Sequence, residues 1–416
     1  SEEFEFYLED LKPKIVIVEK NSKNPVVEVA NKLKIPVCEI KSDGNNLSGD
    51  FNLFEKSSNY VLPGEDHEAL VLHTSGTTSR PKIVPLTNKN IFSSADNISK
   101  SLNLTDKDHC LNIMPLFHIH GLIAVLAASM KVGASVCASS GFNALKFLDN
   151  AKREKITWYS GVPTMHQAIL MRADKNLETA KQLNLRFLRS SSASLPPAVF
   201  EKLNEVFNCP VIEAYGMTEA THQMTSNPLP PKSQKPGFVG IPAGPEVCIM
   251  DTNNKILNQG EEGEVCIRGE NVTSGYENNP DANKNSFSNG WFRTGDQGYF
   301  DKDGYLKISG RLKEIINKGG EKISPLEVDN ILMDHPNIEQ AVCFGYEDKM
   351  LGEDIATAII IKEGMKCTED DIKIYANEKL AKFKIPKKIF FVNEIPKGAT
   401  GKLQRNTLAK KFGLVN

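Results

Sequence analysis

Short apolar runs alternate with longer stretches of helical periodicity along the first half of this chain. Five of these runs are rich in branched and aromatic residues and have the length of buried strands. They are residues 14–18, 69–72, 111–114, 156–159 and 185–188. Because helical segments such as residues 196–206 separate them, the pattern predicts an α/β fold with a doubly wound parallel sheet, in which 69–72 is a buried parallel strand.

The pattern changes after Pro228. Strands punctuated by Pro and Gly, such as residues 264–268, predict an antiparallel, barrel-like region. From Lys313 a shorter α+β pattern follows, in which Ser324 caps a helix and Glu327 completes a capping box. We therefore expect a large N-terminal domain over residues 1–312 and a small C-terminal domain over residues 313–416, with strands at 341–344 and 357–360 in the latter.

Composition narrows the function classes. A chain of 416 residues with 40% hydrophobic content can bury more than one core. Its formal net charge of −2 creates no overall field, so no nucleic-acid partner is expected, and the lysines at 382, 384, 387 and 388 are interpreted as a solvated face. The most apolar run, residues 121–139, is interrupted by Lys131 and Gly133, which predicts a buried helix and then a strand rather than a membrane span.

The cysteines and the chain ends bear on the compartment. Eight cysteines stand far apart without a Cys-x-x-Cys pair, which indicates reduced thiols and no structural metal. The start, Ser1-Glu2-Glu3, lacks the parts of a signal peptide, and the last three residues are not a peroxisomal address. We expect a cytoplasmic protein, with a peroxisomal one as the alternative.

A polar loop directly follows the run 69–72. It joins hydroxyls, a glycine and cations, a combination whose backbone N–H groups and side chains suit a nucleotide's phosphates. The residues predicted to bind are Thr74, Ser75, Gly76, Thr77, Thr78 and Lys82. The spacing of a Walker loop is absent, which argues against a P-loop kinase or GTPase. Taken alone, such a loop is more often a solvated turn.

Four later segments complement the loop. The first places Tyr215, Gly216, Thr218 and Glu219 at the end of a predicted strand, where they offer groups for adenine, phosphate and magnesium. The second places Asp296 in a predicted tight turn, where its carboxylate suits two ribose hydroxyls.

The other two segments lie nearer the C-terminus. Cations and glycines gather about a predicted hinge, namely Arg311, Lys313, Gly319 and Gly320. The last segment presents Lys402 on a loop between glycines. Each segment alone has an ordinary structural reading, as a turn, a core residue or a solvated lysine.

In this order the five segments resemble the adenylate-forming superfamily of acyl-CoA synthetases, luciferases and peptide-synthetase adenylation domains, from about residue 10 to the end. The resemblance implies ATP, Mg²⁺ and CoA, and a small C-terminal domain that swings about a hinge at Lys313. It also implies that Tyr215 stacks on adenine, that Thr218 contacts the α-phosphate and that Glu219 holds Mg²⁺.

The same resemblance implies roles for the remaining matched residues. Asp296 and Arg311 would bind ribose, Lys402 would serve the adenylation step, and Gly319 and Gly320 would line the path of a pantetheine thiol. Because no attached carrier domain is recognisable, free CoA is the expected thiol.

Three segments flank the expected position of the acid and contribute His118, Ser192 and His222. Buried polar groups without partners cost roughly 1–3 kcal/mol each, so a polar lining favours a small polar acid over a fatty acid. The amino-acid sequences of these segments resemble those of the oxalate–CoA ligases of plants and fungi. The resemblance implies that the three residues hold oxalate's second carboxylate. The predicted catalytic residues are Lys402, Thr218, Glu219 and His118.

Alternatives remain open. A 4-coumarate-like or medium-chain acid would fit the same superfamily. Relatives carry a substantial stretch before the segment that matches Ser1, so we expect an N-terminally incomplete large domain, and a catalytically weak ATP- or acyl-binding protein is the rival from another class. Oligomeric state is not predicted.

Overall fold

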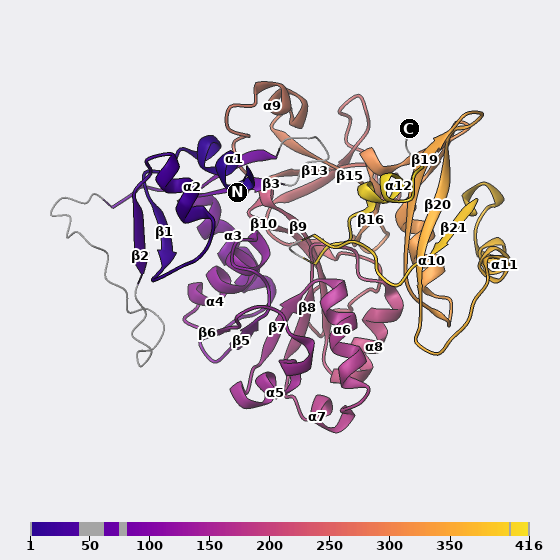
Figure 1. Cartoon of the computed structure of the whole chain (residues 1–416), viewed down its shortest axis with the longest axis horizontal. Coiled ribbons are helices and arrows are strands. Elements are labelled where there is room, and N and C mark those ends of the chain that lie inside the picture. Colours follow the sequence, from indigo (N-terminus) through magenta and orange to yellow (C-terminus); the bar gives the residue numbers. More distant parts are fainter. Residues whose placement is uncertain (1, 41–61, 75–80, 399–400, 415–416) are drawn as a thin grey trace. The chain divides into compact units, whose positions relative to one another are not determined.

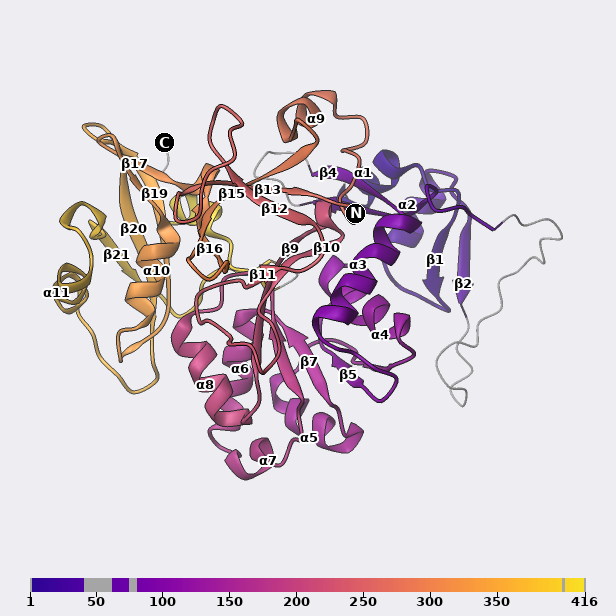
Figure 2. The ribbon, with the colours of Figure 1, turned by 180° about the vertical axis from the view of Figure 1, so that it is seen from behind.

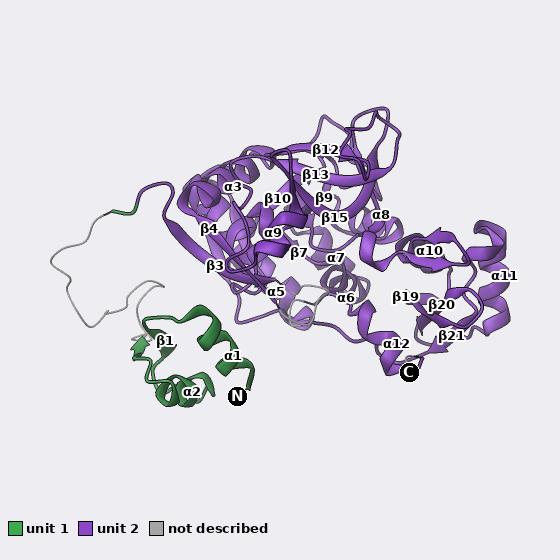
Figure 3. Ribbon diagram, turned by 90° about the horizontal axis from the view of Figure 1, so that it is seen from above, with its two compact units in different colours: residues 1–63 green, residues 64–416 purple. Residues whose placement is uncertain are grey.

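The structure is a computed structural model that describes residues 2–40, 62–74, 81–398 and 401–414 (Figure 1). The chain forms two compact units, residues 1–63 and 64–416, which Figure 3 distinguishes by colour. In the first unit, α1 (Glu2–Leu11) and α2 (Val26–Lys32) accompany the parallel strands β1 (Val16–Glu19) and β2 (Val37–Ile40). Leu8, Val29 and Ala30 form the centre of its small core.

A seven-stranded sheet dominates the second unit, with the order β11-β10-β9-β8-β7-β5-β6. Its parallel strands are β5 (His109–Asn112), β6 (Ser135–Ala138), β7 (Trp158–Gly161), β8 (Phe187–Ser190) and β9 (Val211–Met217). β10 (His222–Ser226) and β11 (Ile241–Pro242) continue it antiparallel. The strands predicted at 111–114, 156–159 and 185–188 are confirmed, each offset by two residues.

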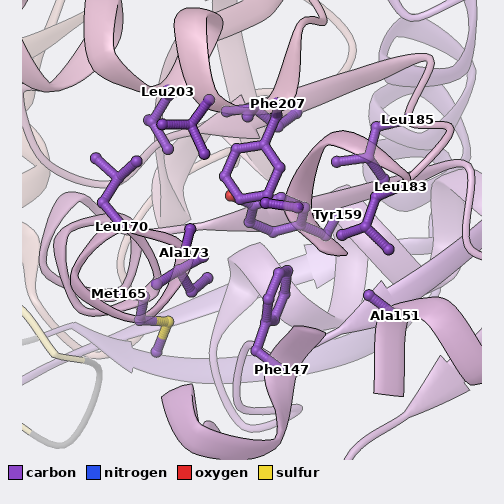
Figure 4. Packing of buried hydrophobic residues seen from close by; sticks show 14 of the residues in the cluster. Phe147, Ala151, Tyr159, Met165, Leu170, Ala173, Leu183, Leu185, Leu203 and Phe207 are labelled. Atoms are coloured by element: carbon purple, nitrogen blue, oxygen red, sulfur yellow. The ribbon is translucent and has the colours of Figure 1, made fainter. Parts of the chain in front are cut away.

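Helices cover both faces of this sheet, as the doubly wound prediction requires (Figures 1 and 2). One face packs α5 (Ala144–Glu154), α6 (Pro163–Ala173), α7 (Leu177–Lys181) and α8 (Pro197–Phe207). The other packs α3 (Asn88–Ser101), a π-helix (His120–Ala127) and α4 (Ala128–Lys131). Successive strand residues point to opposite faces, so Tyr159 packs on Phe147 and Phe207 in the first core (Figure 4), while Trp158 belongs to the second.

The apolar run at 121–139 behaves as predicted. It supplies the π-helix, α4 and then the strand β6. No helix in the described part of the chain is long and apolar enough to cross a membrane.

The prediction for residues 69–72 was wrong. They lie in β3 (Glu68–Thr74), which pairs antiparallel with β4 (Lys82–Thr87) in a separate two-stranded sheet. The side chains of β3 are half-buried or exposed rather than buried. Because β4 starts so soon after β3 ends, the connection is too short for the crossover that a parallel pair needs.

A second sheet contains β12 (Glu246–Met250), β13 (Gly263–Arg268), β14 (Phe287–Ser288), β15 (Trp291–Phe300) and β16 (Leu306–Arg311). All its pairs are antiparallel, as predicted, and the short helix α9 (Pro280–Ser286) precedes β14. Among the described strands the pairs do not close into a barrel. Asp296 lies within β15, so the predicted tight turn at this residue was wrong; Gly295, with φ of 75°, distorts the strand there instead.

The C-terminal part holds a third sheet in the order β18-β17-β20-β19, with β21 on β20. Its elements are β17 (Ile316–Lys318), β18 (Glu321–Ile323), α10 (Pro325–Met333), β19 (Ile338–Asp348), β20 (Gly352–Ile361), α11 (Glu369–Lys379), β21 (Lys388–Phe391) and α12 (Leu408–Lys411). Strands expected at 341–344 and 357–360 are confirmed within β19 and β20.

The capping box predicted for α10 is wrong. The Ser324 hydroxyl donates to the Ser309 carbonyl, and Glu327 pairs with Lys384 at 2.7 Å. Both side chains therefore contact residues outside the helix instead of capping it. A capping box does form at α11, between Thr368 and Asp371.

A buried ion-pair cluster joins the end of the chain to this third sheet. Arg405 Nη2 lies 2.6 Å from Asp329 Oδ2, and Arg405 Nε lies 3.2 Å from Glu314 Oε2. Asp329 is 4% exposed, and burial raises the pKa of its carboxyl group. The guanidinium is therefore needed to offset the cost of burying this charge.

Replacing Arg405 should destabilise the C-terminal sheet. In Arg405→Met, Asp329 stays buried without its cation, which costs about 3–5 kcal/mol. Native-state hydrogen exchange of the β19 and β20 amides measures this loss. Lys373→Met, which breaks an exposed pair with Glu369, is the matched control and should cost about 0.5 kcal/mol or less. Equal protection in the two variants would contradict the assignment.

Candidate active site

Three strands bring Tyr215, Asp296 and Arg311 together. Asp296 of β15 is the register partner of Arg311 of β16. Tyr215 of β9 donates its hydroxyl proton to Asp296 Oδ2 at 2.5 Å, and Arg311 Nε donates to Oδ1 at 2.9 Å. Asp296 raises the pKa of Arg311 above its ordinary value. The carboxylate is thus fixed beside an aromatic ring and keeps acceptor capacity, an arrangement that suits a nucleoside.

A second group surrounds Glu219, which lies in a 3-10 turn (Thr218–Ala220) between β9 and β10. Tyr276 donates its hydroxyl proton to Glu219 Oε1 at 2.8 Å, and Lys82 Nζ lies 4.2 Å from the centre of the Tyr276 ring. Burial lowers the pKa of Lys82, with Lys313 adding to the effect and Glu219 opposing it. Lys82, Lys313 and Glu219 therefore share one electrostatic environment beside Thr218.

The residues around Glu219 fit Mg²⁺ only if phosphate and water oxygens supply most of its ligands. Within the described residues there is no cluster of three or more His, Cys, Asp or Glu side chains that could hold a metal ion. Mg²⁺ bound with a nucleotide commonly uses one or two carboxylates and completes its shell with phosphate and water oxygens. A single buried carboxylate, Glu219, beside two lysines matches that mode.

The predicted phosphate loop is only partly described. Thr74 and Lys82 are register partners at the end of the β3–β4 pair where the connecting loop joins the two strands. Ser75, Gly76, Thr77 and Thr78 lie outside the described residues.

Gly216 allows the close approach of β9 and β10. A Cβ built at Gly216 would lie 1.9 Å from the carbonyl oxygen of His222. The contacted atom belongs to the backbone, so no side-chain movement could relieve the clash. The absence of a side chain at this position sets how near the Tyr215 strand comes to the His222 strand.

The residues predicted to bind the acid gather around a residue that was not predicted, His120. The ring centres of His118 and His222 lie 6.5 Å and 5.0 Å from that of His120. His120 Nδ1 lies 3.0 Å from Ser192 Oγ, and its Nε2 lies 2.6 Å from Ser160 Oγ. We call His118, His120, His222 and Ser192 the acid-site cluster.

Burial keeps these histidines neutral. It lowers the pKa of His118 to about 4 and holds the pKa values of His120 and His222 well below the ordinary value. His118 Nδ1 accepts from the backbone N–H of His120 at 3.2 Å, so the neutral ring carries its proton on Nε2. For His222, neither ring nitrogen has a hydrogen-bond partner among the described residues. Such a buried ring can hydrogen-bond to a polar ligand.

Arg189, also not predicted, lies behind the acid-site cluster. Its side chain is 0% exposed, and burial lowers its pKa to about 9. Nη1 donates to His120 Nε2 and to Ser160 Oγ, each at 3.4 Å, and Nη2 donates to Gln223 Oε1 at 3.1 Å. No carboxylate of the described residues pairs with it, and its Nε has no partner. A buried cation without a counter-ion attracts an anion.

The hydrogen bond from Arg189 also sets the proton positions in the cluster. A guanidinium only donates, so Nε2 of His120 accepts and Nδ1 carries the proton toward Ser192 Oγ. The Ser192 hydroxyl is then free to donate to a ligand.

Two residues of the cluster have unusual backbone conformations. Ser192 has φ of 74° and His222 has φ of 95°. Residues other than glycine rarely adopt this backbone region, and each such residue costs about 1–3 kcal/mol of stability. Such strain is typical of binding and catalytic sites, where the fold holds a side chain in a needed direction.

Lys402 reaches this site from the C-terminal part. Thr164 at the start of α6 donates its hydroxyl proton to the Gly401 carbonyl at 2.9 Å, which anchors the loop. Burial and the charge of Arg311 lower the pKa of Lys402 to about 8, and Lys402 in turn lowers the pKa values of His118 and His222. The ammonium group therefore lies within electrostatic range of Asp296, Arg311 and the acid-site cluster.

Gly319 and Gly320 form the turn between β17 and β18. Their φ values of 61° and 96° make a tight hairpin that favours glycine at both positions. The Gly319 N–H donates to the Leu351 carbonyl at 2.8 Å. None of the contacts described for this turn involves Lys402 or the acid-site cluster.

The sequence contains a weak signal for Arg189 and His120, the two site residues that were not predicted. Arg189 follows the predicted strand 185–188 directly, and a charge at the end of a buried strand invites a functional reading. His120 lies in the same segment as His118, but its burial depends on the packing of the π-helix.

Comparison with known proteins identifies the family. The chain matches the AMP-binding enzyme family over residues 1–277 and the AMP-binding enzyme C-terminal domain over residues 327–402. It is 48% identical to an oxalate–CoA ligase of Arabidopsis thaliana over 99% of this chain and 82% of the relative. It is 44% identical to an oxalate–CoA ligase of Saccharomyces cerevisiae over 99% of this chain and 80% of the relative.

A solved structure shares the fold. ATP-bound MatB from Rhodopseudomonas palustris matches with a TM-score of 0.88 and 29% identity, over 99% of this chain and 81% of MatB. The chain belongs to the AMP-binding enzyme family, and its enzyme class is that of the AMP-forming acid–CoA ligases, which use ATP, Mg²⁺ and CoA. The predicted family, the fold with a large N-terminal and a smaller C-terminal domain, and the cofactors are confirmed at this level, while the domain boundary after residue 312 stays a prediction.

A methyl group at Gly216 should disrupt the junction of the two sites. In Gly216→Ala the new atom collides with backbone, so β9 and β10 must separate, at a cost of about 1–3 kcal/mol or more. We expect a lower melting temperature and a smaller stabilisation by ATP. Gly64→Ala is the control, since its new methyl group would lie 3.4 Å from His67, an ordinary contact. An unchanged ATP response in Gly216→Ala would show that the strands can adjust.

Proposed function

We propose that this chain is an oxalate–CoA ligase, which converts oxalate, ATP and CoA into oxalyl-CoA, AMP and diphosphate. The observation that carries the proposal is the buried, polar acid site, in which the described residues give Arg189 no counter-ion and the His222 ring no hydrogen-bond partner. The names of the Arabidopsis and yeast relatives support it.

A small dianion meets the needs of this site. One carboxylate of oxalate would face the α-phosphate beside Lys402, while the other would accept from Ser192 Oγ, His118 Nε2 and the His222 ring, with Arg189 supplying positive potential from behind. A long apolar acid would leave these groups unpaired, at roughly 1–3 kcal/mol each. This cost argues against a medium-chain or 4-coumarate-like acid in the wild-type site.

The first reaction step needs charge neutralisation rather than a base. A carboxylic acid is already ionised at neutral pH, so its oxygen can attack the α-phosphorus directly. In our proposal Lys402, Lys82 and Thr218 stabilise the negative charge that develops on the phosphate oxygens. Glu219 would hold Mg²⁺, which supplies further charge neutralisation when bound.

The remaining predicted residues receive roles in the same proposal. Tyr215 and Gly216 would bind adenine, Asp296 and Arg311 would bind ribose, and Thr74 would contact the trailing phosphates.

The second step needs Lys402 to leave. We propose that residues 313–416 rotate about Lys313, which withdraws Lys402 and admits the thiol of CoA past Gly319 and Gly320. The hydrogen bond from Thr164 to Gly401 would break in that rotation.

The acid should be identified by pyrophosphate release with ATP and Mg²⁺ against oxalate, malonate, 4-coumarate and octanoate. We expect release with oxalate and a fall of about 100- to 1,000-fold in Lys402→Ala, the loss of about 3–4 kcal/mol of transition-state stabilisation. Lys397→Ala, at an exposed lysine of the same loop, is the matched control and should retain the rate.

Two other outcomes would each contradict a part of the proposal. Preference for another acid would refute the assignment of oxalate while leaving the enzyme class intact. ATP binding by a folded protein without release for any acid would favour the alternative of a catalytically weak binding protein.

The adenylation step should lose rate in alkali. Lys402 has a pKa of about 8, so its charge is present below that value and disappears above it. Single-turnover pyrophosphate release should therefore fall about tenfold per pH unit above pH 8. In Lys402→Arg the guanidinium stays charged, so whatever rate remains should not show this fall. An identical fall in both proteins would exclude Lys402 as the titrating group.

A further inference from the structure

A cavity of about 530 Å³ lies beside the end of α3 and the loop that follows β10. Its wall includes Asn97 and Ser101 of α3, together with Leu229, Pro242 and Ala243. The volume falls within the usual range of small-molecule pockets. Neither nucleotide nor oxalate accounts for it.

Two side chains separate this cavity from the acid-site cluster. Gln223 Nε2 donates to Ser101 Oγ at 2.9 Å and to the Ala243 carbonyl at 3.0 Å, and both partners belong to the cavity wall. On its other side Gln223 Oε1 accepts from Arg189 Nη2 at 3.1 Å. Arg189 then donates to His120 at 3.4 Å. One hydrogen-bonded series therefore runs from the cavity wall to the acid site.

Both separating side chains are completely buried, at 0% exposure. Each holds the other: Gln223 accepts from Arg189 and itself donates to Ser101 of α3. The barrier is polar, whereas the wall beyond it contains Leu229 and several prolines.

We propose that Arg189 and Gln223 form a barrier that limits the length of the acid substrate. Without this barrier, the cavity beyond it would receive the hydrocarbon chain of a medium-length straight-chain carboxylic acid. The inference rests on the proposed function, because it assumes that the acid-site cluster binds the substrate's acyl end.

The two residues have to be changed together. Truncating one alone leaves the other buried without its partner, a cost of about 1–3 kcal/mol that would obscure the result. In the double variant Arg189→Ala and Gln223→Ala, His120 keeps its hydrogen bond to Ser160. If this protein does not fold, the pair Arg189→Val and Gln223→Ala retains more packing while still shortening both side chains.

The test measures pyrophosphate release with oxalate and with straight-chain acids of two to ten carbons. We expect the wild-type protein to favour oxalate. In the double variant, kcat/KM for hexanoate or octanoate should rise about tenfold or more, while that for oxalate should fall. Stabilisation by each acid, read from the melting temperature in the presence of ATP, gives a second measure that needs no turnover.

Filling the cavity provides the control. Asn97→Trp places an indole in the cavity from a half-buried position of α3. In the wild-type background it should leave oxalate turnover unchanged, and in the double variant it should abolish the gain with longer acids. A gain that survives Asn97→Trp would contradict the proposed location.

The outcomes separate the two proposals. A folded double variant that responds normally to ATP but shows neither turnover of nor stabilisation by longer acids would overturn the barrier. If the wild-type protein does not use oxalate, the proposed function fails, and the stabilisation of the double variant by octanoate still decides whether the barrier limits acid length.

Discussion

The close approach of β9 and β10 is the constraint on which the site depends. Because Gly216 lacks a side chain, its strand lies against the carbonyl of His222. The two strands and the turn between them carry Tyr215 and Glu219, which contact Asp296 and Tyr276, and also His222 and Gln223, which contact His120 and Arg189. The spacing between these two groups of side chains is therefore set by one backbone contact, and not by flexible side chains.

Buried cationic side chains lie around the contact between β9 and β10, where burial disfavours their charged form. Burial lowers the pKa values of Arg189 and Lys402, and the histidines between them remain neutral. Neutral rings donate and accept hydrogen bonds without adding to the repulsion. An anionic substrate then supplies what the folded chain lacks, so binding energy is available to order the site.

Particular elements show how far sequence reasoning extends. The alternation of apolar runs and helical segments predicted the doubly wound sheet, because burial on both faces demands apolar strands. It failed at 69–72, where an apolar run forms a hairpin with β4, since the partner of a strand is a tertiary fact. The capping box at Ser324 failed for a related reason: Ser309 and Lys384, distant in sequence, compete for the same side chains. Asp296 has the predicted neighbours in Tyr215 and Arg311, although it lies in a strand and not in a turn.

By itself the sequence determined the family and the order of its motifs and predicted a set of nucleotide-binding residues, because those residues are local groups with recognisable spacing. Only the tertiary structure revealed that His120 is the centre of the acid-site cluster, that Arg189 has no counter-ion among the described residues, and that Gln223 separates the site from a cavity. Burial and missing partners are properties of packing between distant segments. A linear pattern does not contain them, although they bear on which acid the site accepts.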